Sequence, residues 1–319
     1  MPWNPDSAIG NNISYSEANT LANCEWKWDY VYRLGNRGGG STAMAKGTVT
    51  HDMIAAWWET GEIDMEIMLG SFAQMDEAER PSPNERAAIA DWIRWIMPRY
   101  AAHYGSLRDD MEVVAHELEL TAMLPGTAVT VMGHVDGLYR HKATGKLYAV
   151  ERKTYGRRDR LEHLSVDPQV SLYYWLLKAN GYDIAGVMWD GIYTYKWKPE
   201  KPTQKYLIEE AQKDVAKHGR TQSTKAEWAN WARDVLEDHP GIERPVADSF
   251  DLFWLDRTEA QVTQALLDLK GIVDRRTTLR EEGTRPIRNI GNACGWCSAR
   301  SACHEALAFP QSIQLDLSE

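Results

Sequence analysis

The sequence predicts an α/β fold in which a mixed central sheet is flanked by helices. Two stretches, residues 129–139 and 147–154, alternate apolar and polar side chains as neighbouring strands do, and a polar link containing Gly145 joins them. Helical patterns precede and follow this pair of strands. The chain has 319 residues, of which 43% are hydrophobic, so it is long enough to bury a sizeable core.

The first part of the chain, residues 14–105, is predicted to be helical. Ser14 stands three residues before Glu17, which is typical of a capping box, and predicts a helix that runs to about residue 34. Residues 1–12, which are polar and contain Pro and Gly, are expected to be loose. Further helices are predicted over residues 43–60 and 84–104. Four tryptophans on them are expected in the core, because aromatic side chains bury large areas: Trp57, Trp58, Trp92 and Trp95.

The middle part, residues 111–195, is predicted to carry the sheet and the candidate catalytic groups. Its strands are expected at 111–120, 129–139, 147–154 and 185–195. Before the last of these strands, Asp167-Pro168 opens a helix, since proline is favoured in the first helical turn.

The last third of the chain begins with a predicted insertion. Residues 196–248 are polar, charged and low in β-branched side chains, and we expect them to form helices and loops. Residues 249–310 are then predicted to pack with the rest of the domain. They are expected to form a strand at 249–255, a helix at 258–279 and a segment that holds three cysteines. All of residues 1–319 are expected to belong to one domain.

Residues of the central strand pair carry the candidate chemistry. Glu151 and Lys153 are two apart on a strand, so they project to one face while Arg152 projects away. Pairing with the preceding strand would bring Asp136 beside them. Hard divalent cations such as Mg²⁺ or Mn²⁺ take carboxylate and backbone oxygens, so Asp136, Glu151 and the Arg152 carbonyl are candidate ligands. An ion there would polarise a phosphodiester and activate water. The alternative for Glu151 and Lys153 alone is a surface ion pair.

The next helix adds Gln169 and Tyr173, which are four apart and therefore share a face. Taken in order, the pattern G-x-x-D, E-x-K, Q-x-x-x-Y resembles the RecB-like exonuclease branch of the PD-(D/E)XK nuclease superfamily. The residues that carry this resemblance are Gly133, Asp136, Glu151, Lys153, Gln169 and Tyr173. The resemblance implies a restriction-endonuclease-like core in which the Asp and Glu bind metal and the Lys is catalytic. It also implies that the Gln and Tyr support the site or contact DNA.

The helix over residues 43–60 carries a further feature of this family. Gly47 and His51 are four apart on it, and G-x-x-x-H supplies a metal-ligating His in RecB-like nucleases. The resemblance therefore implies that His51 is a metal ligand, whereas a helical His taken by itself is more often an ordinary core or surface residue.

Weaker candidates lie on the two strands before Glu151. His134, two residues before Asp136, would face the same side of its strand and is ranked below His51. Glu117 or Glu119 is expected near the site, as a similar Glu is in relatives, the alternative being an exposed strand carboxylate.

The sequence contains four cysteines, three of them with the spacing C-x2-C-x5-C: Cys24, Cys294, Cys297 and Cys303. In a cytosolic chain, clustered cysteines favour a metal over a disulfide, and four thiolates suit tetrahedral zinc or an iron–sulfur cluster. The arrangement resembles the iron–sulfur RecB-like nucleases, which include CRISPR-associated exonucleases and AddB-type subunits. It implies a structural 4Fe–4S cluster that joins the two ends of the chain. Zinc and four independent core thiols are the alternatives.

The net charge of −10 argues against a protein that coats DNA by bulk charge, although a local basic strip can serve a nuclease. One strip comprises Arg152, Lys153, Arg157, Arg158 and Arg160, and a second comprises Arg275, Arg276, Arg280, Arg285 and Arg288. The predicted DNA-binding residues are Arg157, Arg158, Arg160, Gln169 and Tyr173. A solvated face is the alternative for each strip.

These features together predict a metal-dependent deoxyribonuclease, an exonuclease that uses Mg²⁺ or Mn²⁺. The resemblance implies single-stranded DNA or duplex ends as substrate, in recombination, repair or phage DNA metabolism. No G-x-x-x-x-G-K-[ST] motif occurs, so unwinding would need a helicase or recombination partner. The sequence shows neither a membrane-spanning run nor a signal peptide, so a cytoplasmic location away from membranes is expected. The alternatives are a non-catalytic DNA-binding or assembly subunit and a zinc-stapled nuclease.

Overall fold

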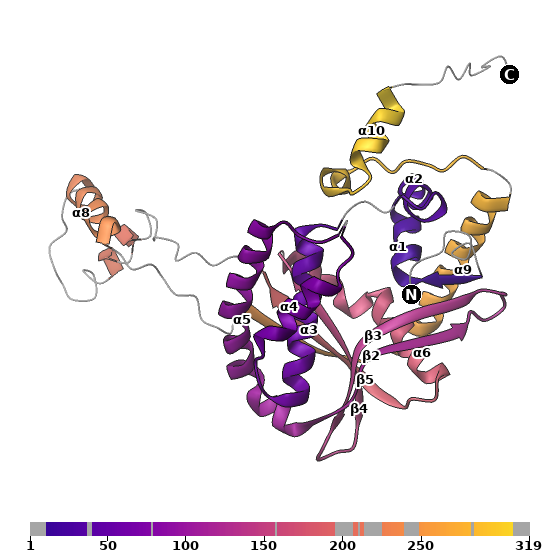
Figure 1. Ribbon diagram of the computed structural model, residues 1–319, viewed down its shortest axis with the longest axis horizontal. Helices are drawn as coiled ribbons and strands as arrows, with labels where there is room; N and C mark the ends of the chain where they lie inside the picture. The colour runs from indigo at the N-terminus through magenta and orange to yellow at the C-terminus, as the bar shows by residue number, and fades with distance from the viewer. Residues whose placement is uncertain are drawn as a thin grey trace.

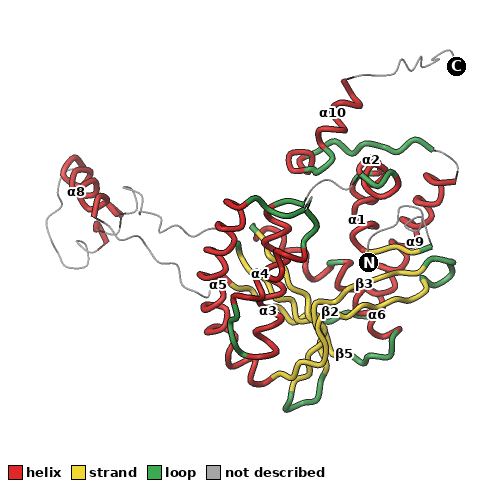
Figure 2. The backbone as a smooth tube through the Cα atoms, in the orientation of Figure 1, coloured by secondary structure: helices red, strands yellow, loops and turns green. Residues whose placement is uncertain are grey.

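The computed structural model describes most of the chain. The described residues are 11–36, 40–77, 79–156, 158–194, 207–209, 211–213, 225–238, 249–281 and 284–308. A mixed sheet of six strands runs through them, with helices on both faces (Figure 2). The predicted α/β fold class is therefore confirmed.

Strand β3 pairs with three other strands of the sheet. The strands are β1 (Asn12–Ser14), β2 (Met111–Met123), β3 (Thr130–His141), β4 (Leu147–Tyr155), β5 (Ile184–Tyr193) and β6 (Phe250–Leu255). β2 pairs antiparallel along one edge of β3, whereas the other edge pairs with β1, in parallel, and with β4, antiparallel. The sheet continues in parallel from β4 to β5 and antiparallel from β5 to β6. β4 therefore lies inside the sheet, between β3 and β5.

Helices form a layer on each face of the sheet. One layer contains α3 (Thr42–Thr60), α4 (Met65–Gln74) and α5 (Pro83–Asp110), and the other contains α1 (Tyr15–Asn23), α6 (Pro168–Ala179) and α9 (Glu259–Glu281) (Figure 1). Alternation along β4 sends Val150 into the core under the first layer and Ala149 into the core under the second. The remaining helical elements are α2 (Glu25–Trp28), a π-helical turn (Asp29–Arg33), 3-10 turns (Arg158–Val166 and Asn292–Trp296), α8 (Lys225–Asp238) and α10 (Arg300–Ala308).

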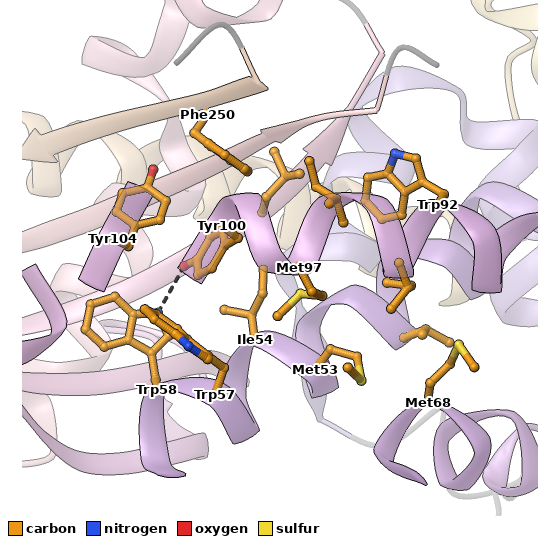
Figure 3. Close-up of a cluster of buried hydrophobic side chains, with 14 of the residues drawn as sticks. Met53, Ile54, Trp57, Trp58, Met68, Trp92, Met97, Tyr100, Tyr104 and Phe250 are labelled. Carbon is orange, nitrogen blue, oxygen red and sulfur yellow. Dashed lines mark hydrogen bonds between the residues drawn. The ribbon is translucent and has the colours of Figure 1, made fainter. Parts of the chain in front are cut away.

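The first core is built around aromatic side chains of α3 and α5. Trp57, Trp58 and Trp92 are buried and Trp95 packs against them partly buried, as predicted. The rings of Trp57 and Tyr100 meet edge to face with centroids 5.4 Å apart, and Trp58 Nε1–H donates to the Tyr100 hydroxyl at 3.0 Å (Figure 3). Such an aromatic pair contributes roughly 1 kcal/mol beyond the area that it buries. This layer supports the strands that carry the candidate site.

The first predicted helix is wrong in its length. Ser14 caps α1 as predicted, because its Oγ accepts a hydrogen bond from the Glu17 N–H at 3.1 Å. The helix ends at Cys24, whose backbone is extended at φ −162° and ψ 105°. The Glu17 carboxylate accepts hydrogen bonds from Trp28 Nε1 at 3.0 Å and from Arg276 Nη1 at 3.2 Å. The side chain of Glu17 is therefore oriented by Trp28 and Arg276, which lie outside α1, rather than by the end of the helix.

Two elements were not predicted. β1 forms at Asn12–Ser14, in a stretch expected to be loose, because β3 offers it a free edge. α4 forms at Met65–Gln74, and Asp64 caps it by accepting from the Glu66 N–H at 2.9 Å. The predicted insertion at 196–248 falls largely outside the described residues; its described helix α8 lies apart from the sheet (Figure 1). In the described part of the chain, no helix has the length and apolar character that crossing a membrane requires.

Candidate active site

The candidate site lies where β3 and β4 separate. Their antiparallel pairing ends at Gly137 and Val150, so the next two positions are Asp136 and Glu151. There the Arg152 backbone N–H donates to the Asp136 Oδ2 at 2.6 Å, and this side-chain bond takes the place of a strand-to-strand bond. The strand pairing thus places the two carboxylates next to each other.

Glu151 and Lys153 share one face of β4. The Glu151 side chain is buried, at 2% exposed, and its carboxylate pairs with the Lys153 ammonium, whose side chain reaches solvent. Burial raises the pKa of Glu151 to about 7; the charge of Lys153 opposes this rise and the charge of Asp136 adds to it. Two carboxylates therefore share one ammonium in a poorly solvated place, an arrangement that an additional cation would stabilise.

His51 reaches this place from α3. Its Nδ1 lies 3.5 Å from Asp136 Oδ1. Burial opposes ionisation of Asp136, but the hydrogen bond and charge of His51 and the charge of Arg152 outweigh burial and lower its pKa. One turn earlier, a Cβ at Gly47 would lie 3.3 Å from Thr154 Oγ1, so glycine lets α3 approach β4 closely.

Gln169 and Tyr173 flank the site from α6. The Gln169 Nε2–H donates to the Tyr173 hydroxyl at 2.9 Å. Burial and the charges of Glu151 and Asp136 raise the pKa of Tyr173, so this phenol faces the two carboxylates and stays neutral. A Cβ at Gly133 would lie 2.5 Å from Leu176 Cδ1, so glycine at this position lets α6 pack closely on β3 without a shift of the Leu176 side chain. 

Glu117 joins the site from β2. It stands opposite Asp136 in the β2–β3 ladder, whereas Glu119 stands opposite His134. Its φ of +47° is a left-handed conformation that costs a non-glycine residue on the order of 1 kcal/mol and is enriched at functional sites. Burial and the charge of Asp136 raise its pKa. His134 is 53% exposed and its Nδ1 lies 3.5 Å from Glu117 Oε2, so it contacts Glu117.

Two residues near the site were not named as site residues from the sequence. Asp167 was predicted only as the start of α6, which it caps by accepting from the Gln169 N–H at 2.8 Å. Its charge also contributes to the raised pKa of Lys153, after the larger effects of opposing burial and of Glu151. Burial, Asp167 and Glu151 raise the pKa of Tyr15 to about 12. The position of Asp167 two residues before Gln169 was the signal in the sequence that could have placed it near the site. Tyr15 lies near the site because β1, which directly precedes it, pairs with β3.

Each of the two basic strips includes an arginine that is buried. Arg152 is 0% exposed and points into the core under α3 and α5, so it is not a DNA contact. Arg276 is 3% exposed and donates to the Asn12 carbonyl at 2.7 Å. Arg275 Nε pairs with Glu25 at 2.7 Å. Of the predicted DNA-binding arginines, Arg157 and the side chains of Arg158 and Arg160 lie outside what the structure describes.

The cysteines lie in segments that contact each other. The Trp26 N–H donates to the Ile287 carbonyl at 3.1 Å, and Asn289 Nδ2 donates to the Asn23 carbonyl at 3.0 Å, on either side of Cys24. The Cys294 thiol lies 3.9 Å from the Asn289 carbonyl. All four thiols are free and partly exposed. The segment around Cys24 and the segment before Cys294 are thus joined by hydrogen bonds, and the predicted cysteine cluster is not seen among the described residues.

The donor atoms of the active site fit a divalent cation. Among the described residues, no three His, Cys, Asp or Glu side chains are grouped closely enough to hold an ion as they stand. His51 and Asp136 are already adjacent, however, and Glu151 follows Asp136 in the strand pairing with its carboxylate turned to Lys153. Oxygen and imidazole donors suit Mg²⁺ or Mn²⁺.

The raised pKa of Glu151 predicts a pH dependence of stability in metal-free protein. A folded-state pKa of about 7, against 4.5 for the unfolded chain, favours folding at low pH, and this contribution is lost as pH rises through 7. The loss amounts to about 3 kcal/mol. The thermal midpoint of chelator-treated wild type, relative to Glu151→Gln, should therefore fall between pH 5 and 8. The exposed Glu162→Gln is the control, and a midpoint difference that stays constant with pH would contradict the prediction.

Comparison with known proteins identifies the superfamily of the chain. Residues 12–304 match the PD-(D/E)XK nuclease superfamily. Among curated proteins, none matches the sequence. The crystal structure of a "Putative exonuclease" from Eubacterium rectale has a TM-score of 0.50 at 12% identity, covering 92% of this chain and 93% of that one. The crystal structure of SSO0001 has a TM-score of 0.40 at 11% identity, covering 92% and 86%. At these identities the likeness concerns the fold, whereas the superfamily match spans almost the whole chain. The chain therefore belongs to the PD-(D/E)XK nuclease superfamily.

Proposed function

We propose that this protein is a divalent-metal-dependent deoxyribonuclease that works as an exonuclease on single-stranded DNA or duplex ends. The observation that carries the proposal is the fork between β3 and β4, which is the point where their pairing ends at Gly137 and Val150. It places Asp136 beside Glu151, pairs Glu151 with Lys153 and sets His51 3.5 Å from Asp136. A buried and a partly buried carboxylate next to one ammonium suit metal-assisted hydrolysis of a phosphodiester.

Each residue of the site has a distinct role in the proposal. His51, Asp136, Glu151 and the Arg152 carbonyl hold Mg²⁺ or Mn²⁺. When bound, the ion polarises the phosphodiester and lowers the pKa of water. Lys153 stays protonated, since neighbouring carboxylates raise its pKa against the effect of burial, and it orients the attacking water or stabilises charge on the phosphate. Gln169 and Tyr173 line the same place from α6 and support the site or contact DNA.

The exonuclease assignment and the DNA contacts go beyond the superfamily. The similar fold from Eubacterium rectale carries the name exonuclease, which supports this activity for the present chain. Arg157, Arg158 and Arg160 follow β4 directly and are proposed to bind the DNA backbone. A helicase or recombination partner would supply opened strands, in recombination, repair or phage DNA metabolism.

A structural 4Fe–4S cluster forms part of the proposal. Cys24 and Cys294 belong to segments that already contact each other through Asn23 and Asn289. The four cysteine thiols are free, and four thiolates are a donor set that suits a cluster. Their coordination would fasten the N-terminal and C-terminal segments together beside α9, and zinc is the alternative ion.

The function is tested with linear and circular DNA. Purified protein with Mn²⁺ is incubated with end-labelled linear single-stranded DNA and, in parallel, with a closed single-stranded circle. Loss of the linear substrate alone is the expected result. Cleavage of the circle as well would replace the exonuclease assignment with an endonuclease. Intact DNA with every divalent ion, from protein whose cysteine site is loaded, would favour a non-catalytic DNA-binding subunit.

A further inference from the structure

We infer that Arg152 is a positioning residue for the metal ligand Asp136, acting from the opposite face of the sheet. The middle position of the E-x-K pattern carries no chemistry in the proposed function beyond its carbonyl. In the structure, however, Arg152 makes the contacts that fix Asp136. The inference deepens the proposed function and rests on its metal site.

Arg152 contacts Asp136 at two points. Its backbone N–H donates to the carboxylate Oδ2 at 2.6 Å, and its guanidinium Nη1 donates to the Asp136 carbonyl at 3.2 Å. These contacts lie where the β3–β4 ladder has ended, so no regular strand pairing holds Asp136 against β4. Arg152 therefore holds both the carboxylate and the backbone of Asp136 on the β4 side, in addition to the ladder with β2 and the contact with His51.

The guanidinium is anchored in turn by the aromatic layer. Its Nη2 donates to the Tyr139 hydroxyl, and its Nε lies 3.9 Å from Asp190 Oδ2. Asp190 also accepts a hydrogen bond from Tyr100, which accepts one from Trp58 (Figure 3). All of these side chains are at most 2% exposed. Buried hydrogen bonds from α3 and α5 to Asp190, and then the ion pair between Asp190 and Arg152, thus connect the two helices with the fork.

The charges along this connection stabilise the buried guanidinium of Arg152 in the position from which it contacts Asp136. A buried guanidinium is costly unless carboxylates surround it, and Arg152 lies between Asp136 on the site side and Asp190 on the core side. A planar guanidinium can satisfy several acceptors at fixed angles, which a lysine ammonium cannot do. Such support behind a metal ligand typically changes metal affinity by about 10- to 100-fold when it is removed.

The test compares two buried arginines. Arg152→Lys keeps the charge and the backbone N–H but loses the guanidinium contacts to Asp136 and Tyr139. Arg276→Lys is the matched control, because Arg276 is also buried and donates to a backbone carbonyl and a carboxylate, at Asn12 and Glu17 away from the fork. The measurements are the Kd for Mn²⁺ by calorimetry without DNA, the kcat and KM for linear DNA, and the thermal midpoint.

The expected result separates positioning from stability. Arg152→Lys should raise the Kd for Mn²⁺ by about 10-fold or more and lower kcat, with KM for DNA within about twofold. Arg276→Lys should lower the thermal midpoint and leave Mn²⁺ binding unchanged. Arg152→Lys with wild-type Mn²⁺ affinity would overturn the inference.

A second variant keeps the inference testable if Arg152→Lys does not fold. Asp190→Asn removes the far anchor while leaving Arg152 in the chain, and should weaken Mn²⁺ binding in the same direction. If Arg152→Lys does not fold, unchanged Mn²⁺ affinity in Asp190→Asn would overturn the inference. Wild-type protein that binds Mn²⁺ but leaves DNA intact would contradict the proposed function alone, since the effect of these variants on binding would still test the role of Arg152.

Discussion

Replacing Lys153 with Ala is expected to lower the rate of DNA hydrolysis by about 100- to 1,000-fold, a range typical for removal of one stabilising group from a reacting centre. Lys153 is the only group among the described site residues that brings a fixed positive charge to Glu151 and still reaches solvent, where a phosphate would approach. The fold should persist, because the side chain is 42% exposed. Binding of Mn²⁺ should persist too, since the proposed ligands remain.

The measurement is the initial rate of release of labelled nucleotides from linear DNA with saturating Mn²⁺. Lys146→Ala, an exposed lysine in the β3–β4 loop, is the control and should retain the wild-type rate. If Lys153→Ala retains half of the wild-type rate or more, the site assigned at the fork is not the one that cuts DNA. Loss of activity together with loss of Mn²⁺ binding would instead show that Lys153 holds the site together.

Replacing Cys294 with Ser is expected to remove the cluster and lower the thermal midpoint by roughly 10 °C, because metal-binding free energy becomes folding free energy when it joins distant segments. Without the cluster, the junction with the N-terminal segment rests on bonds such as those of Trp26 with Ile287 and of Asn289 with Asn23. Activity should fall indirectly, since α1 begins at Tyr15, whose pKa is raised first by burial and then by the charges of Asp167 and Glu151 at the site.

The cluster is measured by iron and acid-labile sulfide content and by visible absorption of the purified protein. Ser301→Ala, an exposed residue of the same segment, should keep the wild-type content. Stoichiometric zinc without iron would establish the zinc alternative. Full iron content and an unchanged midpoint in Cys294→Ser would remove the cluster assignment altogether.

The candidate site could be predicted from the sequence because its residues are related by short-range rules of strand, hairpin and helix geometry. Side chains two apart on a strand share a face whatever surrounds the strand, so Glu151 and Lys153 could be placed together in advance. The register of a hairpin is fixed by its short link, which placed Asp136 near them. The caps of α1 and α6 followed from Ser14 and Asp167 for the same reason, because a cap acts within one helical turn.

Only the tertiary structure decided which distant residues surround a given side chain. Alternation sends Arg152 away from Glu151, but whether it meets DNA or a buried Asp190 depends on α3 and α5 covering that face. Arg276 likewise belonged to an apparent basic strip until Asn12 and Glu17 enclosed it. Periodicity fixes the direction of a side chain, whereas its solvation depends on which element packs above it, and that packing is settled by contacts across the whole chain.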